Sequence, residues 1–255
     1  DLHGEVEASW HSGEDEGHGR GERFPGKLDL QARLHRARAE AVARYLPLGL
    51  SEAARHHVRD AVRGGSISAA SFRIKGNLAD FPFHSVREGE MRIALQMRDL
   101  VYAYLPSHPA EDGRPAFVSP WPAVEQVSGE IEFDRLAMNL RGLNGRIWGY
   151  ELRDVQGGIA DLAAPEQVLT LRGKGKGPAV DLLRFVRLAP LGQKVGSALE
   201  TLSVNGASEF KLDASFPLAD SLPTTLRGSL QLAGNDLRLH PDWPPLLGAR
   251  GTVDF

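Results

Sequence analysis

Apolar residues recur at every second position along most of this chain, and polar residues fill the positions between them. Such alternation is typical of β-strands that bury one face of a pleated sheet. It predicts a strand-rich protein whose sheet presents a continuous apolar surface. The clearest alternating sets are Leu28, Leu30, Ala32 and Leu34; Met91, Ile93, Leu95 and Met97; Ile131 and Phe133; Leu136, Met138 and Leu140; Phe210, Leu212, Ala214, Phe216 and Leu218; and Leu226, Leu230 and Leu232.

Helical spacing occurs in only two regions, and each region holds a pair of short segments. The first pair is expected at residues 39–46 and 51–62, with Gly64-Gly65 ending the second helix. The second pair is expected near residues 178–187 and 191–199. Helices this short need tertiary support. We therefore expect two helix pairs that pack on the sheet.

Several landmarks occur twice in the same order, which indicates an internal repeat. Trp121-Pro122 stands eight residues before Gly129 (129 − 121 = 8), and Trp243-Pro244 stands eight residues before Gly251 (251 − 243 = 8). The repeat predicts a stacked β-architecture made of equivalent units. The other matched landmarks are Pro47-Leu48-Gly49 with Pro190-Leu191-Gly192, and Phe81-Pro82 with Phe216-Pro217.

The landmarks divide the chain into three parts. Residues 1–35 are expected to end a preceding β-repeat and carry a polar insertion at 11–23, residues 36–176 to form the first helix pair and sheet, and residues 177–255 to form a second, truncated repeat. The polar segment 107–119 is expected to be a surface loop inserted into the first copy. Because both ends interrupt strand-like sequence, we expect the chain to be an internal segment of a longer protein.

The composition narrows the possible function classes. The formal net charge is −3 at pH 7, which gives no long-range attraction to nucleic acid. The chain has no cysteine, so disulfides and thiolate metal sites are excluded. No stretch approaches the roughly 20 apolar residues that a membrane-spanning helix needs. We therefore expect a β-protein that does not bind nucleic acid.

Sequence motifs for catalysis or metal binding are missing. There is no Gly-x-Ser-x-Gly elbow, no His-Glu-x-x-His and no cysteine nucleophile. His3, His11 and His18 accompany acidic residues at 14–16, but their spacing matches no defined metal-ligand set. The adjacent pair His56-His57 is expected to point in different directions on a helix. The sequence therefore predicts no catalytic residue, no metal site and no cofactor.

The segment from Arg172 to Gly177 alternates basic residues with glycine and superficially suggests a phosphate-binding loop. Pro178 stands where such a loop would need its later residues. The segment is interpreted as a strand end that leads into a helix. An alternative is that basic residues here contact a lipid headgroup. The candidates for that contact are Lys174, Lys176, Arg184 and Arg187.

The order of landmarks resembles the AsmA-like proteins of the YhdP type. The resemblance covers almost the whole chain from about residue 24 onward, and it assigns no role to the insertion at 11–23 or the loop at 107–119. It rests on Ala43-Arg44-Tyr45-Leu46-Pro47, Lys75-Gly76-Asn77, Asp80-Phe81-Pro82-Phe83, Glu88-Gly89-Glu90-Met91, Tyr102-Ala103-Tyr104, Trp121-Pro122, Gly129-Glu130-Ile131-Glu132-Phe133, the segment at 177–187, and Leu202-Ser203-Val204-Asn205-Gly206.

This resemblance implies an AsmA-like repeating β-groove, similar to the chorein-like bridge proteins. It implies a large envelope protein of a Gram-negative bacterium that crosses the periplasm and is anchored in the inner membrane by a helix outside this chain. Its groove would conduct phospholipid between the inner and outer membranes and support the outer-membrane barrier. The implied partners are phospholipid acyl chains and, through other parts of the protein, the two membranes.

Under this interpretation, alternating apolar residues are candidates to line the groove. They could instead pack as an ordinary core against the helices or an opposing sheet, in a passive scaffold or adhesin-like spacer that transfers no lipid. The candidate lining residues are Leu28, Leu30, Met91, Ile93, Leu95, Met97, Ile131, Phe133, Phe210, Leu212, Leu230 and Leu232.

Overall fold

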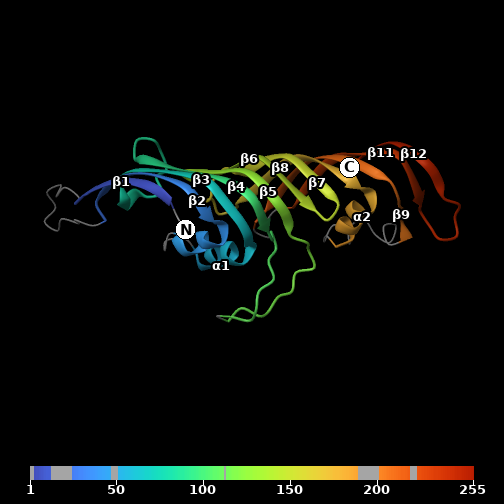
Figure 1. Ribbon diagram of the computed structural model, residues 1–255, viewed down its shortest axis with the longest axis horizontal. Coiled ribbons are helices and arrows are strands. Elements are labelled where there is room, and N and C mark those ends of the chain that lie inside the picture. Colours follow the sequence, from blue (N-terminus) through green and yellow to red (C-terminus); the bar gives the residue numbers. More distant parts are fainter. Residues whose placement is uncertain (1–2, 13–24, 47–50, 112, 189–200, 219–222) are drawn as a thin grey trace.

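The computed structural model describes residues 3–12, 25–46, 51–111, 113–188, 201–218 and 223–255. It shows one curved sheet with short helices on one side (Figure 1). The helices are η1 (Ala39–Tyr45), α1 (Glu52–Ala61), η2 (Leu78–Asp80) and α2 (Ala179–Leu188). The strands are β1 (His3–His11), β2 (Lys27–Arg38), β3 (Val62–Asn77), β4 (Gly89–Tyr102), β5 (Val124–Asp134), β6 (Ala137–Ile147), β7 (Tyr150–Ile159), β8 (Val168–Pro178), β9 (Ser203–Val204), β10 (Ala207–Pro217), β11 (Thr225–Arg238) and β12 (Leu246–Asp254).

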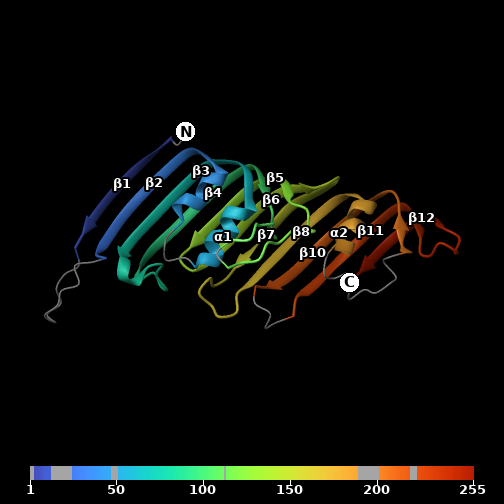
Figure 2. The same cartoon turned by 90° about the horizontal axis from the view of Figure 1, so that it is seen from below.

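The strands follow one another across the sheet in chain order. From β1 to β12 each strand pairs antiparallel with the next, except that the short β9 lies beside β11 and β8 pairs directly with β10. Strands β1 and β12 form the two edges of the unclosed sheet, and the long axis of the molecule runs across the strands (Figure 2). The predicted fold class is confirmed: mainly β, with short helices and an elongated, curved antiparallel sheet.

The pairing register places the apolar alternates of neighbouring strands opposite one another. Leu95 of β4 pairs with Ala70 of β3 and Ile131 of β5, and Ile131 pairs in turn with Leu140 of β6. Residues that pair directly across a ladder point to the same face of the sheet. Apolar side chains therefore form continuous rows across the strands on one face, which we call the apolar face.

A series of β-bulges bends the sheet. The register shifts inside the ladders from β3 to β8 and again between β11 and β12. Asp99 in β4, Gln126 in β5 and Asp154 in β7 have positive φ angles near 50° at these shifts. The N–H of Asp154 donates to Oδ1 of Asn144 in β6 at 3.2 Å. Because a bulge bends its strand and increases the local twist, bulges on successive strands curve the sheet as a whole.

The opposite face, which we call the polar face, is covered by ion pairs between strands. The carboxylate of Glu132 in β5 accepts hydrogen bonds from Arg92 in β4 at 2.6 Å and from Arg141 in β6 at 2.7 Å. Arg73 in β3 bridges Asp29 in β2 and Glu90 in β4. Opposite charges placed across a ladder stabilise the pairing that brings them together. The polar face therefore favours the same register as the apolar face.

The helices lie on the apolar side of the sheet (Figure 2). Ala39 of η1 is buried with Ile67, Ala70, Leu100 and Val127, which come from β3, β4 and β5. A second cluster joins the buried Ala179 and Leu183 of α2 to Val204 of β9. Each cluster is small, so the helices cover the apolar face only in part. Among the described helices, none has the length and apolar character needed to cross a bilayer.

The role expected for Gly64-Gly65 as the end of the second helix was wrong. Helix α1 ends at Ala61, and Gly64-Gly65 lie within β3. A side chain at Gly65, where φ is +108°, would come within 2.8 Å of the Leu100 N atom. Glycine is therefore required here by a bulge and by the close approach of β4, not by a helix end.

Some sequence features lie outside the described residues. They are Pro47-Leu48-Gly49, Pro190-Leu191-Gly192, the expected helix at 191–199 and residues 13–23 of the polar insertion.

We predict that Glu132→Gln lowers the free energy of unfolding by about 1–2 kcal/mol at pH 7, since it leaves Arg92 and Arg141 facing a neutral, buried group. Burial raises the pKa of Glu132, but the two arginines outweigh it and hold this pKa below its ordinary value. The stability from the carboxylate is thus present above the unfolded pKa of about 4.3 and is lost as the pH falls toward the folded one. Urea denaturation at several pH values measures both effects.

The matched control is Glu7→Gln, which changes an exposed carboxylate on the polar face of β1. It should leave the free energy of unfolding within about 0.5 kcal/mol of the unchanged protein. Equal effects of the two substitutions would contradict the role given to Glu132.

Candidate functional site

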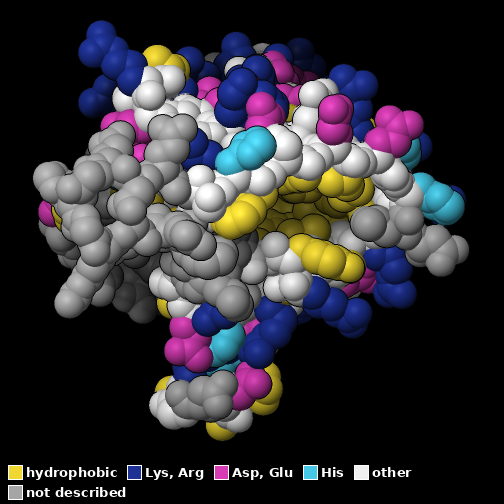
Figure 3. Space-filling model, turned by 90° about the vertical axis from the view of Figure 1, so that its left-hand side faces the viewer, with side chains coloured by type: hydrophobic (Ala, Val, Ile, Leu, Met, Phe, Trp, Pro, Cys, Tyr) yellow, Lys and Arg dark blue, Asp and Glu magenta, His cyan; other side chains and the backbone are white. Residues whose placement is uncertain are grey.

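The apolar face forms the wall of a hollow. Figure 3 looks along the molecule from the β1 end and shows a recess lined by hydrophobic side chains under a charged outer surface. The register places all twelve candidate lining residues on this face. Each of the twelve is half-buried, as expected for side chains that touch their neighbours in the row and leave one side open.

The accessible surface of the molecule agrees with an uncovered sheet face. It is 16472 Å², whereas a compact monomer of 27.8 kDa would expose about 11,000 Å². Among the described residues, the largest fully buried side chains are Phe83, Asn235 and Ser208. The apolar face therefore lacks the second layer of large buried side chains that would make it an ordinary core over its whole length.

Parts of the apolar face are nevertheless occupied by the protein itself. Leu95 and Met97 pack against the cluster beneath η1. At the opposite ends of β3 and β4, the ring of Phe83 lies over Gly76 and Gly89, where a glycine Cβ would meet it at 2.6–2.7 Å. These contacts separate the lining candidates into a filled group, which includes Leu95 and Met97, and an open group.

A flat aromatic pair lies on the apolar face near the C-terminal half of the sheet. The rings of Tyr150 in β7 and Phe210 in β10 are stacked, with centroids 5.5 Å apart and an interplanar angle of 16°. Both rings lie close to Gly175 of β8. The buried hydroxyl of Tyr150 donates to the carbonyl oxygen of Ser208 at 3.0 Å. Glycine at 175 thus allows two rings to lie across β8.

The glycines between Arg172 and Gly177 therefore have a structural role. The segment belongs to β8, as the interpretation as a strand end required, and helix α2 follows it. Gly173 and Gly175 pair with Leu212 and Phe210 on the apolar face. The basic residues between them point to the polar face, which explains the strict alternation.

The four candidate headgroup residues do not come together. Lys174 and Lys176 lie on the polar face, where they form ion pairs with Asp154 at 3.7 Å and Glu209 at 2.7 Å. Arg184 and Arg187 belong to α2 instead. The guanidinium of Arg184 lies 4.1 Å from the ring centre of Trp148, and Nη2 of Arg187 donates to the Leu202 carbonyl oxygen at 2.5 Å.

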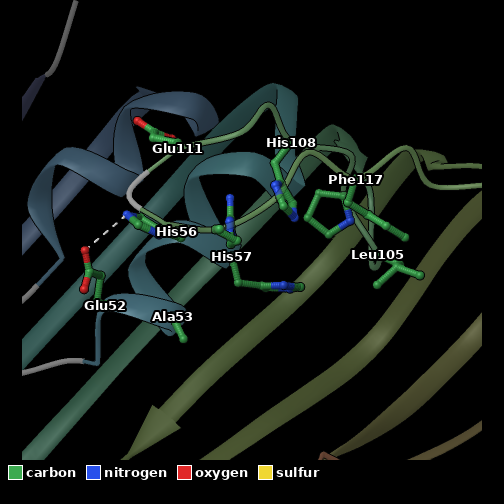
Figure 4. A pocket seen from close by; sticks show the side chains of 10 residues that line it. Glu52, Ala53, His56, His57, Leu105, His108, Glu111 and Phe117 are labelled. Atoms are coloured by element: carbon green, nitrogen blue, oxygen red, sulfur yellow. Dashed lines mark ion pairs between the residues drawn. The ribbon is translucent and has the colours of Figure 1, made fainter.

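A separate cavity of about 390 Å³ lies between α1 and the segment 103–123 that joins β4 to β5 (Figure 4). His56, His57 and His108 all line it, and the adjacent His56 and His57 reach different partners, Glu52 and Tyr102 respectively. Two ion pairs hold the segment against α1: Arg114 with Asp60 at 2.8 Å, and Arg59 with Glu111 at 2.7 Å. The loop expected at 107–119 is thus docked on a helix.

The titratable residues of this cavity include His57, which faces Tyr102 of β4. Burial lowers the pKa of His57, and its Nε2 lies 3.2 Å from the hydroxyl of Tyr102. Burial also raises the pKa of Tyr102. Within the described part of the chain, no three His, Cys, Asp or Glu side chains are placed to hold a metal ion. His3 and His11 are exposed on β1, and His18 lies outside that part.

Several lining positions were missed by reasoning from the sequence. Residues such as Ile74, Phe72, Ile159 and Leu171 extend the rows of the apolar face across β3, β7 and β8. In β7 and β8 the alternation is broken by bulges and by glycines on the apolar face. The recurring Gly-x-Gly of β8 could have identified Leu171, and the alternation of Phe72 with Ile74 could have identified the positions in β3.

Comparison with known proteins agrees with this architecture. The family model described as "YhdP protein" matches residues 3–255. A curated relative from Escherichia coli (strain K12), the "Intermembrane phospholipid transporter YhdP", is 25% identical over 201 residues. That match covers 78% of this chain but only 14% of the relative. No solved structure matches the chain.

We predict that Gly175→Ala destabilises the protein by about 1–3 kcal/mol, because the added methyl group overpacks a close contact. Its Cβ would lie 2.8 Å from Cε1 of Tyr150 and even closer to the ring of Phe210. Gly64→Ala in β3 is the matched control, since its Cβ would lie 3.7 Å from the nearest atom, Cγ2 of Val101. Thermal denaturation of both variants checks the difference, and a Gly175→Ala protein as stable as the control would refute it.

Proposed function

Because the chain belongs to the YhdP family, we propose that it is an internal segment of a bridge that conducts phospholipid, with acyl chains carried on the apolar face of the sheet. The observation that carries this proposal is that apolar side chains form rows across the strands on that face. Twelve half-buried apolar side chains from β2, β4, β5, β10 and β11 share the face that walls the hollow, with Leu95 and Met97 packed beneath η1. We infer that this hollow is filled by the lipid rather than by the protein.

The physical reason is the cost of exposing acyl chains to water. Each CH₂ group costs about 0.8 kcal/mol, so two long chains cost on the order of tens of kcal/mol. An apolar trough that continues from strand to strand removes most of this cost along the path. Hydrophobic and dispersion contacts are non-directional, so many similar contacts in series let a lipid slide without a deep trap.

We propose that lipid contacts the lining candidates that lie outside the helix clusters. Ile93, Phe133, Leu212 and Leu230 lie outside the clusters formed beneath the helices. Leu95 and Met97 pack against one of those clusters, so we assign them a supporting role. Lys174 and Lys176 lie on the polar face. Any headgroup contact made from the apolar side would therefore involve Arg184 and Arg187 of α2.

The proposal extends to the longer protein. The chain spans 14% of the E. coli relative, so transport between membranes would depend on parts outside it. We propose that the segment lies in the periplasm of a Gram-negative bacterium, within a protein anchored in the inner membrane. Conducting phospholipid toward the outer membrane would maintain the barrier of that membrane. This role requires no catalytic step.

A passive β-rich scaffold or spacer is the alternative. It would use the same strands only to span a distance, and its apolar face would bind no lipid. The two functions differ in whether phospholipid remains bound to the purified protein and whether a charge on the apolar face removes it.

We predict that Leu230→Glu reduces bound phospholipid at least about tenfold, because a carboxylate among Phe210 and Val253 would have to be desolvated by each passing acyl chain. Gln231→Glu is the matched control: it places the same charge on the next residue, which is exposed on the polar face. Native mass spectrometry measures the bound phospholipid, and circular dichroism checks that both variants fold.

The same two variants are then compared in the complete protein, in an assay that follows transfer of a fluorescent phospholipid between vesicles. Only Leu230→Glu should slow the transfer. Phospholipid that stays bound in both variants would contradict the assignment of the apolar face. An unchanged protein that carries no phospholipid under the same conditions would support the spacer.

A further inference from the structure

Trp121 connects the first unit of the chain to a helix of the second. It lies just before β5, and its ring makes an edge contact with Phe185 of α2 at 5.5 Å and 84°. On its other side, Tyr104 makes a similar edge contact at 5.2 Å and 82°. Aromatic pairs with this geometry contribute beyond the area that they bury. Trp121 is therefore held between the segment after β4 and a helix that follows four strands later.

Trp243 occupies the equivalent position in the second unit. Trp121 precedes Gly129 by eight residues, as Trp243 precedes Gly251. The strand pairing is also equivalent, because Met97 pairs with Gly129 and Leu232 pairs with Gly251. The next matched pairs are Leu95 with Ile131 and Leu230 with Val253.

The surroundings of the two tryptophans match on one side only. Trp243 has His240 in the place of Tyr104, with ring centres 6.1 Å apart. Where Trp121 meets Phe185, however, Trp243 is 61% exposed. Leu246 and Leu247, the first two residues of β12, are exposed as well, and β12 is an edge strand. Clusters of exposed large apolar side chains mark interaction sites.

We propose that Trp243 is the docking site for a short amphipathic helix of a following unit of the same polypeptide, one that presents an aromatic side chain as α2 presents Phe185. The contact of Trp121 with α2 is the established interface that this one would repeat. The chain spans 14% of its E. coli relative, so a longer polypeptide has ample length for another such helix.

The chemistry of α2 defines the expected partner. Phe185 contacts Trp121, while the adjacent Arg184 lies over Trp148 in the turn after β6. Leu183 is buried beneath the same helix. The docking helix is thus expected to carry an aromatic residue beside an arginine, with leucine on the inner face. Because 64 residues separate Trp121 from Phe185 (185 − 121 = 64), its aromatic residue should lie about the same distance after Trp243, apart from loop insertions.

Photo-crosslinking in the complete protein tests this inference. p-Benzoylphenylalanine is placed at position 243, and the crosslinked peptides are identified by mass spectrometry. The expected product is an intramolecular crosslink to a helix about 64 residues further along the chain. The same group at position 121 is the positive control and should crosslink to peptides that contain Phe185, whereas the same group at the exposed Val118 should give neither product.

Each other result overturns the inference. A crosslink to a second copy, recognised by mixing isotopically labelled and unlabelled protein, would make this surface a dimer contact. A crosslink to another protein or to phospholipid would assign it a different occupant. Absence of a product at position 243 while position 121 reacts would leave Trp243 without a docking role. The crosslink does not depend on lipid transfer, so its result tests the docking of Trp243 independently of the proposed transport.

Discussion

The pairing register of neighbouring strands decides which side chains share a face of this sheet. Side chains alternate with a period of two, so a slip of one residue would transfer a whole apolar set to the other face. The ion pairs of Glu132 with Arg92 and Arg141 impose the same register on β4, β5 and β6 from the polar face. The helices, the hollow and the proposed lipid path all require this alignment, because each uses side chains from several strands.

Three devices convert the aligned sheet into a trough. Bulges in successive strands supply the curvature, and helices on one rim cover part of the apolar face without filling it. Glycines on that face leave room for neighbouring side chains: Gly175 lets the rings of Tyr150 and Phe210 lie across β8. The result combines a rigid outer surface of ion pairs with an inner surface whose apolar side chains are only half-buried. That combination supports a variable apolar guest better than a dry core.

The sequence predicted the fold where alternation was unbroken. Strands carrying sets such as Leu28 to Leu34 and Met91 to Met97 lie where expected, and all twelve lining candidates share one face. It failed where glycine or a bulge replaced the apolar alternate, as in β7 and β8, because neither leaves a hydrophobic period. It could not separate Lys174 and Lys176, which lie on the polar face, from Arg184 and Arg187 of α2, and it could not show that Leu95 packs beneath η1, since both depend on tertiary contacts.

The direction of the strands has a mechanical consequence. Because the long axis runs across the strands (Figure 2), the hydrogen bonds between strands point largely along the length of the molecule. Tension applied between its two ends would be borne by those ladders one after another, and the weakest of them would limit the strength of the whole. The cross-strand ion pairs on the outer surface act as additional ties against such peeling.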